Sequence, residues 1–363
     1  MKRLHNYDGV DSFRMIAAFL ALAAHTYPLS SISADLNYVL IHVFARIVVP
    51  FFMMTTGYFL LPKYFEQDKQ DEQVEQLKQS REPLYRFIKK IGVLYIGATL
   101  LYLPASIYAG FYSGGNALQA FIRNFLIDGT FYHLWYLPAK IVGVFLVYAL
   151  SLKCSLRTTF SVSVVLYIFG MLGDNYYHLI ANVQFLQSTY ESAFQIFSYT
   201  RNGLFYAPVF LTMGAMIAKQ EKPFCDRANI IGFIVCMLLM LIESTLLQRF
   251  GAPRHTSMYI MLLPCSFFLF GFLRSKQGKR SHFMRTASMW IFILHPLLII
   301  VTRGGARIFG LTDILVGNSV VFFFCVSALS LTCAVLISKR EVIYSRLATV
   351  LQYLFRRKKL HRQ

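Results

Sequence analysis

The sequence predicts an all-helical protein that crosses a membrane many times, and three observations lead to this prediction. Of the 363 residues, 56% are hydrophobic and only 15% are charged. The apolar residues gather in runs that are long enough to span a bilayer. The basic residues fall mainly in alternate connections between these runs. We therefore expect a multi-pass helical bundle that is integral to the cytoplasmic (plasma) membrane.

Ten apolar runs predict ten transmembrane helices. The expected spans are residues 12–29, 38–61, 86–108, 131–152, 158–175, 202–219, 228–247, 256–273, 286–304 and 314–337. The run at 158–175 is broken by two glycines and an aspartate near its end. The aromatic and polar stretch 175–200 that follows is interpreted either as an outer loop or as a re-entrant segment.

The distribution of basic residues predicts the orientation. Most of the 36 lysines and arginines lie in segments on the same side as the N-terminus. The opposite side holds six arginines, namely Arg123, Arg201, Arg249, Arg254, Arg303 and Arg307. Because basic residues are retained in the cytoplasm, both termini are expected there. The net charge of +19 is then explained by orientation and by anionic inner-leaflet lipid, and we expect no nucleic-acid partner.

The orientation predicts a transmembrane domain, a cytoplasmic loop within that domain and a cytoplasmic tail. Residues 1–337 are expected to form one transmembrane domain, with a mixed-charge cytoplasmic loop at about 62–85. Residues 338–363 are expected to form a basic cytoplasmic tail, and we expect no appended soluble catalytic domain. The six cysteines show no paired spacing, so neither a disulfide framework nor a metal site is predicted.

The first span carries two ionisable side chains, Arg14 and His25. Eleven helical residues place them within about 20° on one face and about 16 Å apart along the axis. Asp11 lies one turn before Arg14, where the two side chains can pair. Such charges are costly in a membrane and are usually functional, so a built site is favoured over a core histidine. A cleaved signal peptide is the alternative for this segment, but the charges of Asp11 and Arg14 argue against it.

Cations outnumber carboxylates within the expected spans. This imbalance favours an anionic or phosphate-bearing ligand over a cation pathway. The candidate ligand-binding residues are Arg46, His133, Trp135, Lys140, Arg201, His295 and Arg303. Simpler roles remain open: Arg46, Arg201 and Arg303 can snorkel or cap helix ends, Lys140 can snorkel beside lipid, and His295 can bind carbonyls freed by Pro296.

The third span opens with Arg86, Lys89 and Lys90 at helical spacing. This pattern is consistent with a site for an anionic donor or a lipid head group. Plain anchoring of the helix on the cytoplasmic side is the alternative.

These patterns resemble the acyltransferase-3 family of integral membrane acyltransferases. The family's Asp-x-x-Arg start and Arg-x10-His pattern read here as Asp11-Ser-Phe-Arg14 and Arg14-x10-His25. Further similar segments are Pro50-Phe-Phe-Met-Met-Thr-Thr-Gly57, His133-Leu-Trp135-Tyr136-Leu and Ile293-Leu-His295-Pro296-Leu. Thr56 stands where the family usually has serine, which keeps a hydroxyl in place.

Within the family, two runs are similar to the membrane domain of the membrane-bound serine racemases of vancomycin-resistance systems. These runs are Gly9-Val-Asp11-Ser-Phe-Arg14 and Thr200-Arg201-Asn202-Gly203. Those proteins also carry a cytoplasmic racemase domain, which we expect to be absent here. Racemase activity is therefore not expected.

The family resemblance implies O-acyl transfer. The donor would be cytoplasmic acyl-CoA, commonly acetyl-CoA, used as a co-substrate with no bound cofactor. The acceptor would be a hydroxyl of a cell-envelope glycan, a lipid-linked sugar or another small molecule. Two alternatives are a carrier or uptake component for a small amino acid such as serine, and a membrane scaffold for a separate envelope enzyme.

The resemblance also implies roles for individual residues. His25 would act as the general base, and Asp11 would hold Arg14 in position. Arg14 would bind the phosphates of the donor. The spacing of Arg86, Lys89 and Lys90 adds these three cations as candidate donor contacts.

Overall fold

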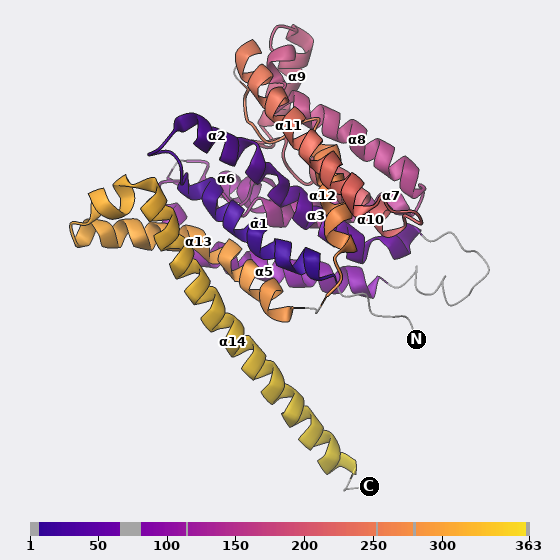
Figure 1. Ribbon diagram of the computed structural model, residues 1–363, viewed down its shortest axis with the longest axis vertical. Helices are drawn as coiled ribbons and strands as arrows, with labels where there is room; N and C mark the ends of the chain where they lie inside the picture. Colours follow the sequence, from indigo (N-terminus) through magenta and orange to yellow (C-terminus); the bar gives the residue numbers. More distant parts are fainter. Residues whose placement is uncertain (1–6, 66–80, 114, 252, 279–280, 361–363) are drawn as a thin grey trace. The chain divides into compact units, whose positions relative to one another are not determined.

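The computed structural model describes residues 7–65, 81–113, 115–251, 253–278 and 281–360, which form helices joined by turns and contain no strand (Figure 1). The predicted all-helical class is therefore confirmed. Contacts divide the chain into two compact units. One unit combines Met1–Asn37 with Lys276–Gln363, and the other is Tyr38–Ser275.

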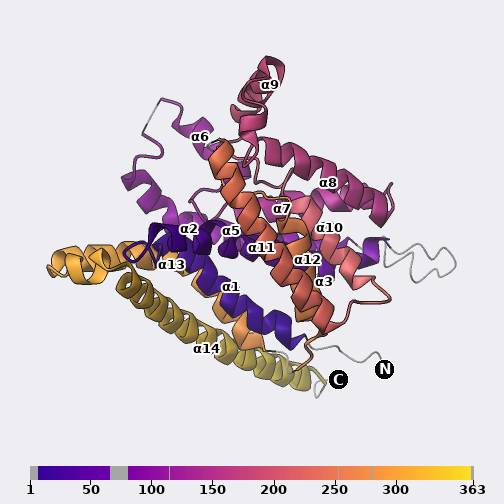
Figure 2. The same ribbon diagram turned by 45° about the horizontal axis from the view of Figure 1, so that its top comes forward.

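The first unit is built on three helices: α1 (Asp8–Thr26), α13 (His282–Ile308) and α14 (Ser319–Leu360). A π-helical turn at Asp313–Gly317 precedes α14. Both views show α1 lying along α13 (Figures 1 and 2). Their shared core includes the fully buried Ala18 and Leu22 of α1, Ala287 and Ile291 of α13, and Val326 of α14. The small alanines allow close approach of the helix backbones.

The second unit contains the remaining helices. They are α2 (Ala34–His42), which begins in the first unit, α3 (Val48–Leu60), α5 (Glu82–Tyr108), α6 (Ala117–Arg123), α7 (Tyr136–Ser151), α8 (Leu156–Leu172), α9 (Gln184–Phe194), α10 (Ala207–Ala218), α11 (Asp226–Phe250) and α12 (Leu262–Ser275). α10 is buried along nearly its whole length and packs against α3, α7 and α8. α11 packs along α12, as Figure 2 shows.

Five helices among the described residues are long and apolar enough to cross a membrane. They are Ala34–Leu60, Glu82–Tyr108, Asp226–Phe250, His282–Ile308 and Ser319–Lys339. Four shorter helices, α7, α8, α10 and α12, are also apolar. The chain is thus a multi-pass membrane protein, and ten crossings with cytoplasmic termini stay a prediction.

Each of the ten expected spans overlaps a helix, but several boundaries differ. The second span is interrupted by a 3-10 turn at Phe44–Ile47. Residues 131–135 and 202–206, expected inside spans, form turns before α7 and α10. The stretch 175–200 contains the short helix α9. Most of the predicted polar loop, residues 66–80, and the side chains of the basic tail from 340 onward lie outside the described residues.

The contact between α3 and α10 depends on two glycines. A Cβ atom on Gly57 would overlap the carbonyl of Leu211, and a Cβ atom on Gly214 would overlap the carbonyl of Met54. The backbones of the two helices therefore touch where only hydrogen fits. This explains why the Thr-Thr-Gly segment of the second span needs glycine.

We expect Gly57→Ala to destabilise the protein because the two helices must separate to admit the methyl group. Overpacking of this kind costs about 1–3 kcal/mol. Thermal unfolding of the purified protein in detergent should show a lower melting temperature. Gly97→Ala in α5 is the matched control, because no atom outside its own helix turn lies within 4 Å of that Cβ position. Equal melting temperatures for the two variants would contradict the packing argument.

Candidate functional site

A buried carboxylate joins α1 to α13. The side chain of Asp11 is 4% exposed, and Arg285 donates two hydrogen bonds to it, from Nε to Oδ1 and from Nη2 to Oδ2, each at 2.8 Å. The backbone N–H of Ser281 donates to Oδ2 at 3.3 Å. Arg14 Nε lies 3.5 Å from Oδ1, as the one-turn spacing predicts. Asp11 is therefore shared by two guanidinium groups from two helices.

This arrangement places two partly exposed cations beside one carboxylate. Two arginines share one carboxylate, and their side chains remain 21% exposed for Arg14 and 31% exposed for Arg285. The two-point contact with Asp11 fixes the plane of the Arg285 guanidinium. Such a fixed and partly exposed pair of cations is suited to binding an anionic group.

Two imidazoles meet further along the same helices. The rings of His25 and His295 are stacked, with centroids 5.3 Å apart and an interplanar angle of 19°. His295 is fully buried, and its Nδ1 lies 3.1 Å from the carbonyl oxygen of Ile291. Because a carbonyl only accepts hydrogen bonds, this contact assigns the proton of the neutral His295 ring to Nδ1. The ring is thereby fixed against His25.

The two contacts show that α1 and α13 run parallel. Asp11 meets Arg285 at the N-terminal ends, and His25 meets His295 nearer the C-terminal ends. Each helix carries an arginine followed by a histidine ten or eleven residues later, which corresponds to about 15 Å of helix axis. One helix pair therefore has a cationic end and an imidazole end.

Four members of this site, Asp11, Arg14, His25 and His295, were predicted from the sequence as functional residues, and the role of a fifth was missed. Asp11, Arg14 and His25 were expected to act together, and they lie on one helix. Arg285 was grouped with the basic inner connections, whereas it binds Asp11. The signal that identifies it is its spacing to His295, which nearly repeats the spacing of Arg14 to His25.

The second unit brings together three other predicted residues. The guanidinium of Arg201 lies against the rings of Trp135 and Tyr199, at 4.8 and 4.5 Å from their centroids. Arg46 Nη2 donates to His42 Nδ1 at 2.9 Å and to Thr256 Oγ1 at 3.1 Å. Burial and the charge of Arg46 lower the pKa of Arg201, so the two arginines are electrostatic neighbours.

Three more candidates have separate surroundings. His133 is 2% exposed, and its ring lies against those of Tyr102 and Phe131. Lys140 is 8% exposed with Nζ 4.3 Å from the centre of the Tyr136 ring, so it is buried and does not extend into lipid. In the first unit, Arg303 is exposed and lies against Phe322.

The cationic start of the third span lies in the second unit. Arg86, Lys89 and Lys90 are exposed in the first turns of α5, and Arg86 Nε is 2.7 Å from Glu82 Oε1. The hydroxyl of Thr56 on α3 donates a hydrogen bond to the carbonyl oxygen of Phe52 at 3.1 Å. This hydroxyl proton is therefore bound within the same helix.

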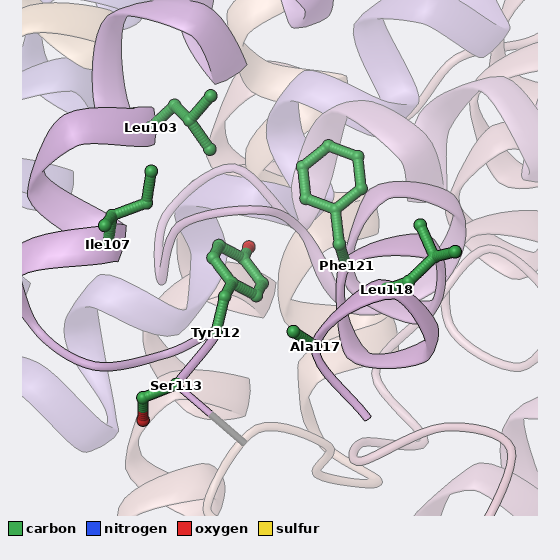
Figure 3. Close-up of a pocket in the computed structure, with 7 residues that line it drawn as sticks. All are labelled: Leu103, Ile107, Tyr112, Ser113, Ala117, Leu118 and Phe121. Atoms are coloured by element: carbon green, nitrogen blue, oxygen red, sulfur yellow. The ribbon is translucent and has the colours of Figure 1, made fainter. Parts of the chain in front are cut away.

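An apolar pocket of about 530 Å³ lies between the end of α5 and α6 (Figure 3). Its lining consists of Leu103, Ile107, Tyr112, Ser113, Ala117, Leu118 and Phe121. None of the residues that the sequence analysis singled out contributes to this lining. The candidate site is therefore defined by paired side chains and not by this pocket.

The chain is an all-helical membrane protein that carries paired arginine and histidine side chains on two parallel helices. The family described as "Acyltransferase domain", the acyltransferase-3 family, matches residues 7–339. The chain belongs to this family, as the motifs of the first span predicted.

Curated relatives carry racemase names. The chain is 36% identical over 339 residues to an amino-acid racemase from Enterococcus faecalis, covering 93% of this chain and 46% of the relative. It is 32% identical over 292 residues to a serine/alanine racemase from Enterococcus gallinarum, covering 80% of this chain and 40% of the relative. The chain thus spans less than half the length of these relatives. No solved structure matches the chain.

Proposed function

We propose that this chain is a membrane O-acyltransferase. It moves an acyl group, acetyl in the simplest case, from cytoplasmic acyl-CoA to a hydroxyl of a cell-envelope glycan, a lipid-linked sugar or a small acceptor. The observation that carries the proposal is the α1–α13 pair, with Asp11 held between two arginines at one end and His25 stacked on His295 at the other. Family membership supports the same activity. The proposal places the protein in the plasma membrane with both termini in the cytoplasm.

The cationic end of the pair is the proposed donor site. Arg14 and Arg285 are partly exposed guanidinium groups, and guanidinium groups bind phosphates well. Asp11 keeps both arginines in place through its two oxygens. The exposed cations Arg86, Lys89 and Lys90 of α5 belong to the second unit, and donor binding by them is a separate proposal.

The imidazole end is the proposed site of proton transfer. Neutral His25 accepts the proton of the acceptor hydroxyl as its oxygen attacks the thioester carbonyl. The C–O bond forms and the C–S bond breaks, and the departing CoA sulfur takes the proton from the imidazolium. His295 is a positioning residue, because its ring is fixed to the Ile291 carbonyl and stacks on His25.

We expect Arg14→Gln to raise the acyl-CoA concentration needed for half-maximal activity by about tenfold. Losing one charge-assisted contact to phosphate costs about 1.5–3 kcal/mol. Transfer of label from acetyl-CoA, measured in membranes over a range of donor concentrations, gives this value. Arg307→Gln removes the same charge from an exposed position on α13 and is expected to leave this concentration unchanged. An unchanged donor dependence in Arg14→Gln would remove Arg14 from the donor site.

A second candidate function is transport of a small amino acid such as serine. The names of the curated relatives, which include a serine/alanine racemase, are consistent with it. Proteoliposomes that contain the purified chain would then accumulate labelled serine without any acyl-CoA. The acyltransferase proposal expects no such accumulation above that of empty liposomes.

A further inference from the structure

Two aromatic rings hold Arg201 in a fixed orientation. Its guanidinium lies against the faces of Trp135 and Tyr199, at 4.8 and 4.5 Å from the ring centroids. Its Nε is buried and has no hydrogen-bond partner among the described residues. Stacking on aromatic rings fixes the guanidinium plane but leaves its N–H edge available for an acceptor.

Arg46 reaches the same region from the turn that precedes α3. Its Nη2 donates to His42 and Thr256, and its Nε is buried without a partner in the described part of the chain. The ring of His255, next to Thr256 in the sequence, lies 4.5 Å from that of Tyr199. The segment 255–256 therefore links the surroundings of Arg46 to those of Arg201.

Arg46, Arg201 and Asp174 together carry one positive unit when the exposed Arg254 is not counted. Burial, together with the neighbouring arginines, lowers the pKa of His255 to about 4, so this histidine is neutral at physiological pH. Asp174 is fully buried, and its Oδ1 accepts from the backbone N–H groups of Ser257 at 2.6 Å and Met258 at 3.0 Å. Asp174 interacts electrostatically with both arginines, so two cations face one carboxylate.

Several buried polar atoms in this region have no hydrogen-bond partner among the described residues. Asp174 Oδ2 is buried without a hydrogen-bond partner in the structure. The next residue, Asn175, is 1% exposed, and both polar atoms of its side-chain amide also lack a partner there. Leaving buried polar groups unsatisfied costs about 1–3 kcal/mol each. A ligand that accepts from the buried N–H groups, which are Arg46 Nε, Arg201 Nε and Asn175 Nδ2, would remove part of this cost. The acceptor atoms Asp174 Oδ2 and Asn175 Oδ1 need a donor instead.

We propose that Arg46 and Arg201 form a binding site for a singly charged oxyanion, either a carboxylate or a phosphodiester. Both groups present two oxygens to the N–H edges of guanidinium groups. A single negative charge balances the net positive unit, whereas a doubly charged phosphate would leave an uncompensated charge in a largely buried place. This two-arginine site lies within the second unit and is independent of acyl transfer.

Trp135 provides a direct readout of the two-arginine site. The chain has two tryptophans, Trp135 and Trp290, so Trp290→Phe leaves Trp135 as the single indole reporter. The purified full-length variant in detergent is titrated with propionate, dimethyl phosphate and inorganic phosphate while its fluorescence is measured. We expect a saturable change with propionate or dimethyl phosphate, at a concentration about tenfold or more below that required for inorganic phosphate.

Matched substitutions in the Trp290→Phe background test the assignment. Arg46→Gln and Arg201→Gln are each expected to weaken binding about tenfold or more. Arg254→Gln removes the same charge from an exposed arginine that lies against Phe194, and binding should stay within about twofold. Arg201→Lys keeps the charge but loses the planar fork, so it should weaken binding while size-exclusion behaviour stays that of the parent.

The outcomes separate the possibilities. Saturation by propionate identifies a carboxylate ligand, and saturation by dimethyl phosphate identifies a phosphodiester such as a lipid head group. No saturable change, or binding that persists in both glutamine variants, would overturn the proposal. Because no acyl donor is present, failure here leaves the acyltransferase proposal untouched.

Discussion

His25→Ala is expected to reduce acyl transfer by about 100- to 10,000-fold, because loss of a general base has effects of this size. His25 is only partly buried in the last turn of α1, so the variant should still fold. Label transferred from acetyl-CoA in membranes, normalised to the amount of protein by immunoblot, measures the effect.

His282→Ala is the control for this substitution. It removes an exposed imidazole from the first turn of α13, and activity should stay within about twofold of the parent. Full activity in His25→Ala, at normal protein levels, would remove His25 from the role of base.

Asp11→Ala is expected to cause the second large effect, a loss of both stability and activity. The substitution leaves Arg14 and Arg285 as neighbouring cations without their shared carboxylate. Removing one partner of a buried ion pair lowers the free energy of unfolding by about 3–5 kcal/mol. The melting temperature in detergent should therefore fall clearly. Acyl transfer should fall as well, because the donor site loses the group that positions its arginines.

A double-mutant cycle separates this interaction from general damage. Arg285→Ala alone should also destabilise, but Asp11→Ala with Arg285→Ala should be less destabilised than the sum of the two single variants. Coupling between contacting charges is about 0.5–3 kcal/mol. Asp313→Ala, an exposed acid of the same unit, should leave the melting temperature unchanged. Strictly additive effects of the two single variants would show that the Asp11–Arg285 contact carries no energy.

The helical class was predictable because hydropathy is a local property of the chain. Helix starts were less well predicted, since the turns at 131–135 and 202–206 contain large aromatic and apolar residues and adjoin apolar helices. Proline supplied a signal that hydropathy ignores. Pro208 lies in the first turn of α10, where a missing N–H costs nothing, and it marks the start of that helix.

The candidate site was only partly predictable because it joins distant segments. Arg14 and His25 share one helix, so their spacing was sufficient to relate them. Arg285 and His295 follow Asp11 and His25 by about 270 residues in the sequence, and no local pattern indicates which helices pack together.

The same limit applies to the second unit. Arg46 and Arg201 were both singled out as intramembrane or interfacial cations. Their association through His255 and Asp174 depends on how the segment 255–258 folds, which the sequence does not indicate. Burial was also missed for Lys140, because a lysine in an apolar run was compatible with lipid exposure as well as with packing on Tyr136.

The most direct test of the central claim is transfer of label from acetyl-CoA into the envelope fraction of membranes that contain this chain. The proposed mechanism predicts labelling above that of membranes without the chain, lost in His25→Ala and retained in His282→Ala. Labelling that does not depend on the chain, or that is unchanged in His25→Ala, would contradict the proposal that the α1–α13 pair carries out acyl transfer.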